Sequence, residues 1–185
     1  MSVIHLLPVG PPDGAVLERL RRGLQEILRV DCQLLPDSLD PKPFLHAQRQ
    51  QYHSTQILSA LSGLLPNGCW RLLGVTSVDL YMPILTFVFG EAQLTGRCCV
   101  VSWRRLTQGF YGLPNDPELF AARLLKESVH ELGHTLGLTH CQDYGCVMAA
   151  SHSVEWIDIK GADFCPACHE HALSVIPARR RFGIF

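Results

Sequence analysis

Residues 130–148, HELGHTLGLTHCQDYGCVM, hold the side chains with the clearest capacity for chemistry. On a helix, His130 and His134 are four residues apart, so both imidazoles lie on one face within reach of a single metal ion. Glu131 is turned away from both by about 60–100°, so it can stand beside a metal without ligating it. This is the position of a general base for a metal-activated water molecule.

His140 is the expected third ligand of this metal. Gly137 can end the helix because glycine readily adopts the left-handed conformation of helix C-termini, and the chain can then return to the metal. Three imidazoles leave the fourth position of a zinc ion open, as in catalytic zinc sites. The alternative is a chance cluster of surface histidines, but the spacing HExxHxxGxxH is far more restrictive than HExxH alone.

Four cysteines follow the histidines in two close pairs. Two pairs about twenty residues apart favour a closed Cys₄ zinc site, which is structural because it has no open position. A redox-active CxxC is an alternative, but this segment lacks the βαβ context of thioredoxin-like motifs. The four residues are Cys141, Cys146, Cys165 and Cys168.

The other histidines and cysteines have simpler interpretations. His152, His169 and His171 are spare candidate ligands, and exposed surface positions are the more common outcome for such residues. The remaining cysteines lie in or beside apolar runs, so we expect small buried hydrophobic side chains; they are Cys32, Cys69, Cys98 and Cys99.

Hydrophobic periodicity predicts the elements that must position these residues. Alternating β-rich and helical patterns give the order β-α-β-α-β-β-β-α, followed by an irregular C-terminal part with little core of its own. Asp116 is the expected N-cap of the last helix, with Pro117 in its first turn. The predicted strands cover 3–9, 31–36 and runs within 70–103, and the predicted helices cover 14–29, about 46–65 and 116–137.

The run ILTFVFGEA, residues 84–92, has two competing interpretations. It can be an edge strand that borders the active site and pairs with an extended substrate, because adding a strand to a sheet edge is a known recognition mode. Its apolar density equally suits a fully buried central strand. The pairing of this run therefore determines whether it borders a substrate cleft.

Composition narrows the functional classes. The formal net charge of −1 does not favour nucleic acid or an anionic membrane as a partner. No apolar run reaches the length of a membrane span, and the N-terminal residues lack the pattern of a signal peptide, so we expect a cytoplasmic protein. In a reducing compartment, cysteines are more often metal ligands or core residues than disulfides. Arg179–Arg181 is expected to be a solvated tail.

The combined motif resembles the archaemetzincins, a family of the metzincin clan. HExxHxxGxxH is followed by Cys141-x₄-Cys146-x-Met148, and Met148 fits the methionine turn beneath the zinc of that clan. Sixteen residues separate Met148 from Cys165, within one of the family spacing. The segment 75–92 is also similar to the central segment of the family.

The resemblance implies an α+β metzincin-type fold with a mixed, mostly parallel five-stranded twisted sheet and three main helices. It implies one catalytic domain over 1–185, with a sheet-and-helix part over 1–137 and a zinc-bound C-terminal part over 138–185. It also implies two zinc ions. His130, His134 and His140 match the ligands of the catalytic zinc, Glu131 matches the general base, and the four cysteines match the ligands of the structural zinc.

The resulting prediction is a monomeric zinc metallopeptidase that hydrolyses peptide bonds. One alternative is a non-catalytic module that uses its zinc-containing fold to hold a partner peptide. Glu131 favours the enzyme, since a binding module has no need of a base at that position. The other alternative is a zinc hydrolase of a non-peptide amide, which would use the same activated water.

Overall fold

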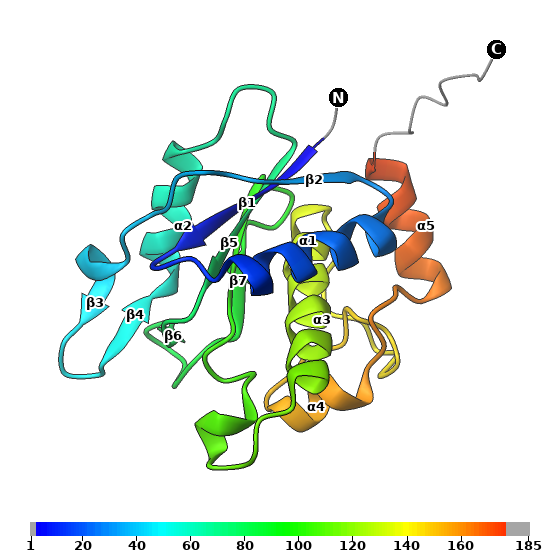
Figure 1. Cartoon of the computed structure of the whole chain (residues 1–185). Coiled ribbons are helices and arrows are strands. Elements are labelled where there is room, and N and C mark those ends of the chain that lie inside the picture. The colour runs from blue at the N-terminus through cyan, green and yellow to red at the C-terminus, as the bar shows by residue number, and fades with distance from the viewer. Residues whose placement is uncertain (1–2, 177–185) are drawn as a thin grey trace.

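The computed structural model describes residues 3–176, and its centre is a five-stranded sheet (Figure 1). The strand order is β2-β1-β5-β8-β7; the first four strands are parallel, and β7 runs antiparallel to β8 at one edge. This confirms the expected mixed, mostly parallel sheet. The strands are β1 (Val3–Val9), β2 (Asp31–Leu34), β5 (Arg71–Thr76), β7 (Gly90–Ala92) and β8 (Cys98–Ser102).

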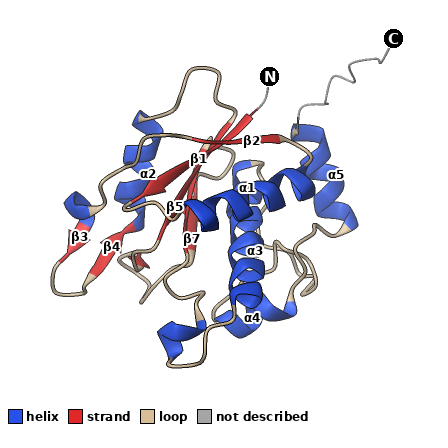
Figure 2. Ribbon diagram, viewed as in Figure 1, coloured by secondary structure: helices blue, strands red, loops and turns tan. Residues whose placement is uncertain are grey.

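Helices cover both faces of this sheet. Figure 2 shows α1 (Gly14–Leu28) and α3 (Pro117–Thr135) on one side, with α2 (Ser54–Gly63) on the other. Because side chains alternate along a strand, Cys99 and Val101 of β8 join the core beneath α1 and α3, whereas Cys98 and Val100 join the core beneath α2. Both faces of the sheet are therefore shielded from water, which explains why the sequences of the central strands are continuously apolar.

The four cysteines outside the C-terminal pairs are buried in these cores, as expected. Burial raises the pKa of the Cys32 thiol to about 12 and that of the Cys69 thiol to about 11. These side chains therefore remain protonated at neutral pH and behave as small apolar groups.

The predicted helix over 46–65 is wrong in its first part. Residues 45–53 instead form a hairpin whose turn includes Gln50 at φ 53°, and α2 begins at Ser54. The apolar residues that favoured the helix, including Ile57 and Leu61, all lie within α2 or just after it. The hairpin belongs to a second sheet of β3 (Leu45–His46), β4 (Gln51–His53) and β6 (Leu80–Tyr81), preceded by the 3₁₀ turn η1 (Lys42–Phe44).

Local signals place α3 as expected. The Asp116 carboxylate accepts hydrogen bonds from the backbone N–H groups of Glu118 and Leu119 at 3.1 and 3.0 Å, and Pro117 occupies the first turn. The last helical residue is Thr135, two residues before the predicted end, and Gly137 follows at φ +91°. The chain turns there, which directs His140 back toward the helix.

The C-terminal part is more ordered than its sequence indicates. It contains α4 (Val154–Ile159) and α5 (Pro166–Val175), and it contributes Val147, Met148 and Ile157 to the core beneath α3. The expectation of an irregular segment with little core is therefore wrong. A 3₁₀ turn, η2 (Gln108–Tyr111), precedes α3.

The predicted absence of a membrane-spanning segment can be compared with the helices of the structure. Among residues 3–176, no helix is long and apolar enough to cross a bilayer. The arginines at 179–181 lie outside the described residues.

Candidate active site

The structure brings the three predicted histidine ligands together. One ring nitrogen from each of His130, His134 and His140 lies within 4.8 Å of the others. The Nε2 atoms of His130 and His134 are 3.1 Å apart. His130 is buried, His134 is half-buried and His140 is exposed, so the cluster opens toward solvent on one side.

The hydrogen bonds of the two helical histidines test whether this cluster suits a metal. The Nδ1 atoms of His130 and His134 lie 2.8 and 2.7 Å from the carbonyl oxygens of Val147 and Leu138. Since a carbonyl only accepts, each Nδ1 carries the proton and each Nε2 presents a lone pair. Two lone pairs 3.1 Å apart repel each other unless a cation lies between them. Tetrahedral zinc–nitrogen bonds of about 2.0–2.1 Å imply a separation of about 3.3 Å, so the donor set fits zinc.

The electrostatics of the cluster agree with ligation. Burial lowers the pKa of all three imidazoles, and that of His130 falls well below its ordinary value. A neutral imidazole is the form that ligates a metal, so these side chains need not lose a proton near neutral pH before binding.

Glu131 lies beside the histidines in a buried position. Burial raises the pKa of its carboxyl group well above the ordinary value, and the neighbouring Glu127 carboxylate adds to this effect. Its side chain packs against Gly90 of β7: a Cβ atom at Gly90 would lie 2.6 Å from Oε1 of Glu131. Only a residue without a side chain leaves this space for the carboxylate.

These residues line a cleft of about 620 Å³. One wall is the segment 85–92 and the other is 150–152, with the histidines and Glu131 between them. A larger groove of about 790 Å³ lies between α1 and α3, but its lining has no histidine or cysteine. The chemistry therefore points to the smaller cleft.

The edge-strand interpretation of 84–92 is confirmed for its last third. β7 covers Gly90–Ala92 and, within residues 3–176, pairs only with β8, so the buried central-strand alternative is wrong. Residues 84–89 are not a strand of this sheet, and Ile84 and Leu85 are exposed. The Thr55 hydroxyl of α2 donates to Oε1 of Glu91 at 2.9 Å, which ties the edge strand to the layer above it.

The three spare histidines are exposed, as expected, but they differ in position. His152 lines the cleft on the wall opposite β7. The Nε2 atom of His171 lies 3.1 Å from the carbonyl oxygen of Leu136, so it binds the C-terminal end of α3. His169 is exposed on α5 and is not part of the cleft lining.

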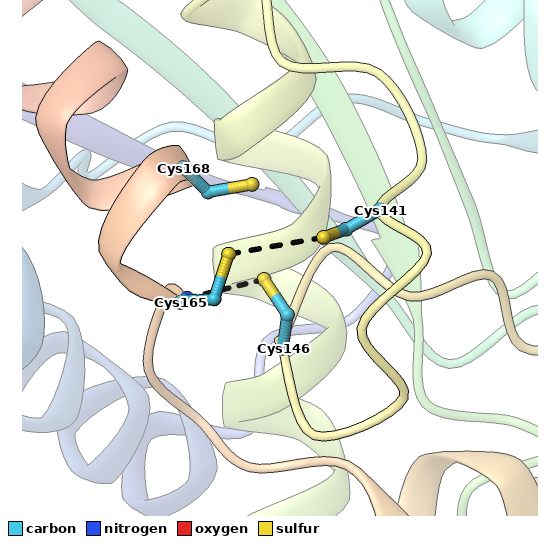
Figure 3. Close-up of side chains that lie close together, drawn as sticks. All are labelled: Cys141, Cys146, Cys165 and Cys168. Carbon is cyan, nitrogen blue, oxygen red and sulfur yellow. Dashed lines mark hydrogen bonds between the residues drawn. The ribbon is translucent and has the colours of Figure 1, made fainter.

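The two cysteine pairs form a second cluster behind α3. Their four sulfur atoms point into a common space (Figure 3), and all lie within 4.8 Å of one another. They are reduced, and Cys146 is buried while the other three are half-buried. Cys141 directly follows His140, so the two clusters share one short connection.

The sulfur geometry of the second cluster suits a tetrahedral metal. Cys141 Sγ and Cys165 Sγ are 3.8 Å apart. Zinc–sulfur bonds of about 2.3 Å imply nearly the same sulfur–sulfur distance, about 3.8 Å. Cys146 Sγ accepts hydrogen bonds from the backbone N–H groups of Met148 and Cys165 at 3.4 and 3.3 Å, and such donors stabilise thiolates. Four thiols without a disulfide, held by amide donors, are a fitting donor set for zinc.

Two buried charged residues next to the histidines were missed by the sequence analysis. Glu127 lies on α3 one turn before His130, and Lys160 follows α4. Nothing in their local pattern distinguishes them from solvated charges. Only the packing of α4 against α3 brings them together.

Comparisons with known proteins agree with this site and fold. The model of peptidase family M54 matches residues 42–173. An archaemetzincin of Methanocaldococcus jannaschii is 39% identical over 165 residues, covering 89% of each chain. The crystal structure of an archaemetzincin from Archaeoglobus fulgidus, complexed with malonate, has a TM-score of 0.79 and 37% identity, covering 92% of this chain and 99% of that chain.

A second solved structure shows the same fold. A zinc-dependent peptidase from Methanocorpusculum labreanum has a TM-score of 0.84 and 28% identity, covering 91% of this chain and 99% of that one. The family match over 42–173 includes β5, β7 and β8 of the main sheet, α3 and both cysteine pairs, so the resemblance noted in the sequence is confirmed. The chain belongs to peptidase family M54, the archaemetzincins, which are zinc metallopeptidases.

Proposed function

We propose that this chain hydrolyses peptide bonds in the cleft between β7 and residues 150–152, with Glu131 as its general base. The observation that carries the proposal is the meeting of three neutral imidazoles and one buried carboxylate at a sheet edge that is free within the described residues. His130, His134 and His140 are the proposed ligands of a catalytic zinc. When bound there, zinc would lower the pKa of a water molecule to about 7 and would polarise the scissile carbonyl group.

The residues of the chain have separate tasks in this reaction. Glu131 takes a proton from the attacking water and later passes it to the leaving amine, so it must stay close to both groups. Val147 and Leu138 hold the rings of His130 and His134 through their carbonyl groups, which keeps the ligating nitrogens aimed into the cleft. Burial raises the pKa of the Glu131 carboxyl group, which makes it a stronger proton acceptor than an exposed carboxylate.

The substrate is proposed to bind as an added strand. The outer edge of β7 has backbone groups that pair with no other described strand, and an extended peptide can satisfy them. The glycine at 90 leaves room for the Glu131 carboxylate beside this edge. Addition of a strand there places a backbone carbonyl of the substrate beside the histidine cluster.

The four clustered cysteines are proposed to hold a second zinc ion with a structural role. Four sulfur ligands complete a tetrahedral shell, so no position remains for a substrate. We further propose that the chain acts as one catalytic unit over 1–185, because residues 138–176 supply His140, one cleft wall and part of the main core.

The function is tested by digesting an unbiased peptide library with the purified protein, with and without a mild chelator. Cleavage is expected in the untreated sample, to be abolished by the chelator and restored by added zinc. Mass spectrometry of the products identifies the cleaved bonds. Absence of cleavage in a sample with measured zinc in the histidine site would contradict the peptidase function.

Gly90→Ala is expected to lower kcat at least about 10-fold, because the new Cβ lies 2.6 Å from the Glu131 carboxylate and must displace it. Gly63→Ala is the matched control, since a Cβ at Gly63 meets no atom within 4 Å. Peptide hydrolysis and zinc content are measured for both variants. Unchanged kcat in Gly90→Ala would show that the position of Glu131 does not limit turnover.

A further inference from the structure

Among residues 3–176, Lys160 is the least exposed charged residue. Its side chain is 1% exposed, and that of Glu127 is 4% exposed. Lysine is almost never this buried without a partner, because the ammonium group loses its hydration. Lys160 Nζ lies 2.8 Å from Oε1 of Glu127 and donates to the carbonyl oxygen of Ala149 at 3.2 Å.

These partners belong to two different elements of the active site. Glu127 lies on α3, three residues before His130 and four before Glu131. Ala149 directly follows Met148 and begins the segment whose residues 150–152 form one cleft wall. Lys160 therefore connects the helix that carries the base to the wall that faces β7.

The same ammonium group also contacts a proposed metal ligand. Lys160 Nζ is 3.5 Å from Nδ1 of His130, the nitrogen that lies 2.8 Å from the Val147 carbonyl oxygen. Because Nδ1–H of His130 donates to the Val147 carbonyl, the ammonium group is a close neighbour of this nitrogen and not its hydrogen-bond partner; its positive charge favours the neutral form of the ring. Both contacts are on the side of the ring opposite the nitrogen that faces His134.

A contribution to folding stability does not by itself explain the buried ion pair of Lys160 and Glu127. The cost of removing two charges from water can equal or exceed their attraction, and well-packed apolar replacements of buried ion pairs are often neutral or stabilising. Removing only one partner is harmful, because the other charge is then buried without compensation. Replacing both charges together can therefore remove a geometric role of the ion pair without a large loss of stability.

We propose that Lys160, through Glu127 and Ala149, is a positioning residue that fixes His130 and the 149–152 wall relative to α3. This rests on the proposed function of the cleft, and Lys160 itself does not touch the reacting atoms. The ion pair sets the position of the 149–152 wall relative to α3, and with it the position of the nearby Val147 carbonyl that orients the His130 ring. Groups that support a metal ligand in this way typically change metal affinity about 10–100-fold when removed.

The decisive variant replaces both charges with apolar side chains, Glu127→Leu together with Lys160→Met. Its melting temperature is expected to stay close to that of the parent, because no lone charge remains in the core. Its kcat is expected to fall at least about 10-fold with little change in KM, and the histidine-site zinc to bind about 10-fold more weakly. Zinc affinity is measured by competition with a chromogenic chelator.

Two single variants complete the experiment. Lys160→Arg keeps the positive charge and is expected to recover part of the lost kcat and affinity. Lys126→Met is the matched control, because Lys126 also joins α3 to α4, by donating to the carbonyl of Ile157 at 3.0 Å, but has no contact with His130. Its kcat and zinc affinity are expected to match those of the parent.

The outcomes separate the two proposals. A double variant with parental melting temperature, kcat and zinc affinity would overturn the positioning role. If the double variant does not fold, Lys160→Arg is the test of the positioning role. A fully parental kcat and zinc affinity in this variant would show that the exact position of the charge at residue 160 is unimportant, which would overturn that role. A parent that cleaves no peptide would refute the proposed function, and zinc affinity would still test the role of Lys160.

Discussion

Glu131→Gln is expected to lower kcat about 10²–10⁴-fold while the protein stays folded and keeps its zinc. Loss of a general base has this typical effect, and the amide has nearly the shape of the carboxylate but cannot take up the proton of water. The three histidines are not changed, so zinc content should equal that of the parent. The measurements are single-turnover peptide hydrolysis, zinc per chain and circular dichroism.

The stability of this variant follows from the pKa of the parent carboxyl group. Burial raises the pKa of Glu131 above its ordinary value of 4.5, so the folded, metal-free protein holds this proton more tightly than the unfolded chain. As pH rises above about 4.5, the unfolded chain loses the proton first, and the contribution of Glu131 to stability falls. The side chain of Glu131→Gln does not titrate, so this variant has no such loss of stability as pH rises. Without metal, its melting temperature at neutral pH should equal or exceed that of the metal-free parent.

Glu170→Gln provides the control, because Glu170 is exposed on α5 and does not line the cleft. It should retain parental kcat. Activity of Glu131→Gln within a factor of two of the parent would assign the base to another group and would favour the peptide-binding alternative over the enzyme.

Cys165→Ser is expected to remove the zinc ion proposed at the four cysteines and to lower the melting temperature. Structural zinc bound by cysteines contributes an apparent binding energy of about 10–16 kcal/mol in small peptides, and this energy is coupled to folding. Here the main core also holds Val147, Met148 and Ile157, so the effect should be partial. Hydrogen exchange should increase first in 141–146 and in α5, while α3 and the sheet remain protected.

Activity should fall indirectly in the same variant, because Cys141 adjoins His140 and its backbone N–H donates to the Met148 carbonyl at 2.9 Å. Cys98→Ala is the control: Cys98 is buried in the core beneath α2, which contains none of the four clustered cysteines, and its removal should leave the zinc content unchanged.

The two proposed zinc ions should also differ in their response to chelation. The histidine site keeps an open position and faces solvent through His140, so a mild chelator should empty it first and leave circular dichroism nearly unchanged. One zinc per chain in freshly purified, reduced protein would refute the two-site proposal. Simultaneous loss of both ions together with unfolding would show that their roles are not independent.

Several features of this protein are determined within a few residues of sequence, and these were predicted well. The histidine spacing follows from the pitch of one helix, the N-cap from Asp116 and its two neighbours, and the turn at Gly137 from the conformational freedom of glycine. The cysteine spacing similarly indicated one cluster of four thiols. Each depends on local geometry, so neighbouring residues carry enough information.

Other features depend on partners far away in the chain, and only the tertiary structure decided them. The edge position of β7 is set by which strand lies beside β8, and the apolar run 84–92 suited an edge or a centre equally. The start of α2 depends on a hairpin that pairs with β6, and the core of the C-terminal part depends on α3. Lys160 and Glu127 are thirty-three residues apart, and in sequence each resembles a solvated charge. Burial and pairing are properties of the packed chain, so composition and spacing alone do not determine them.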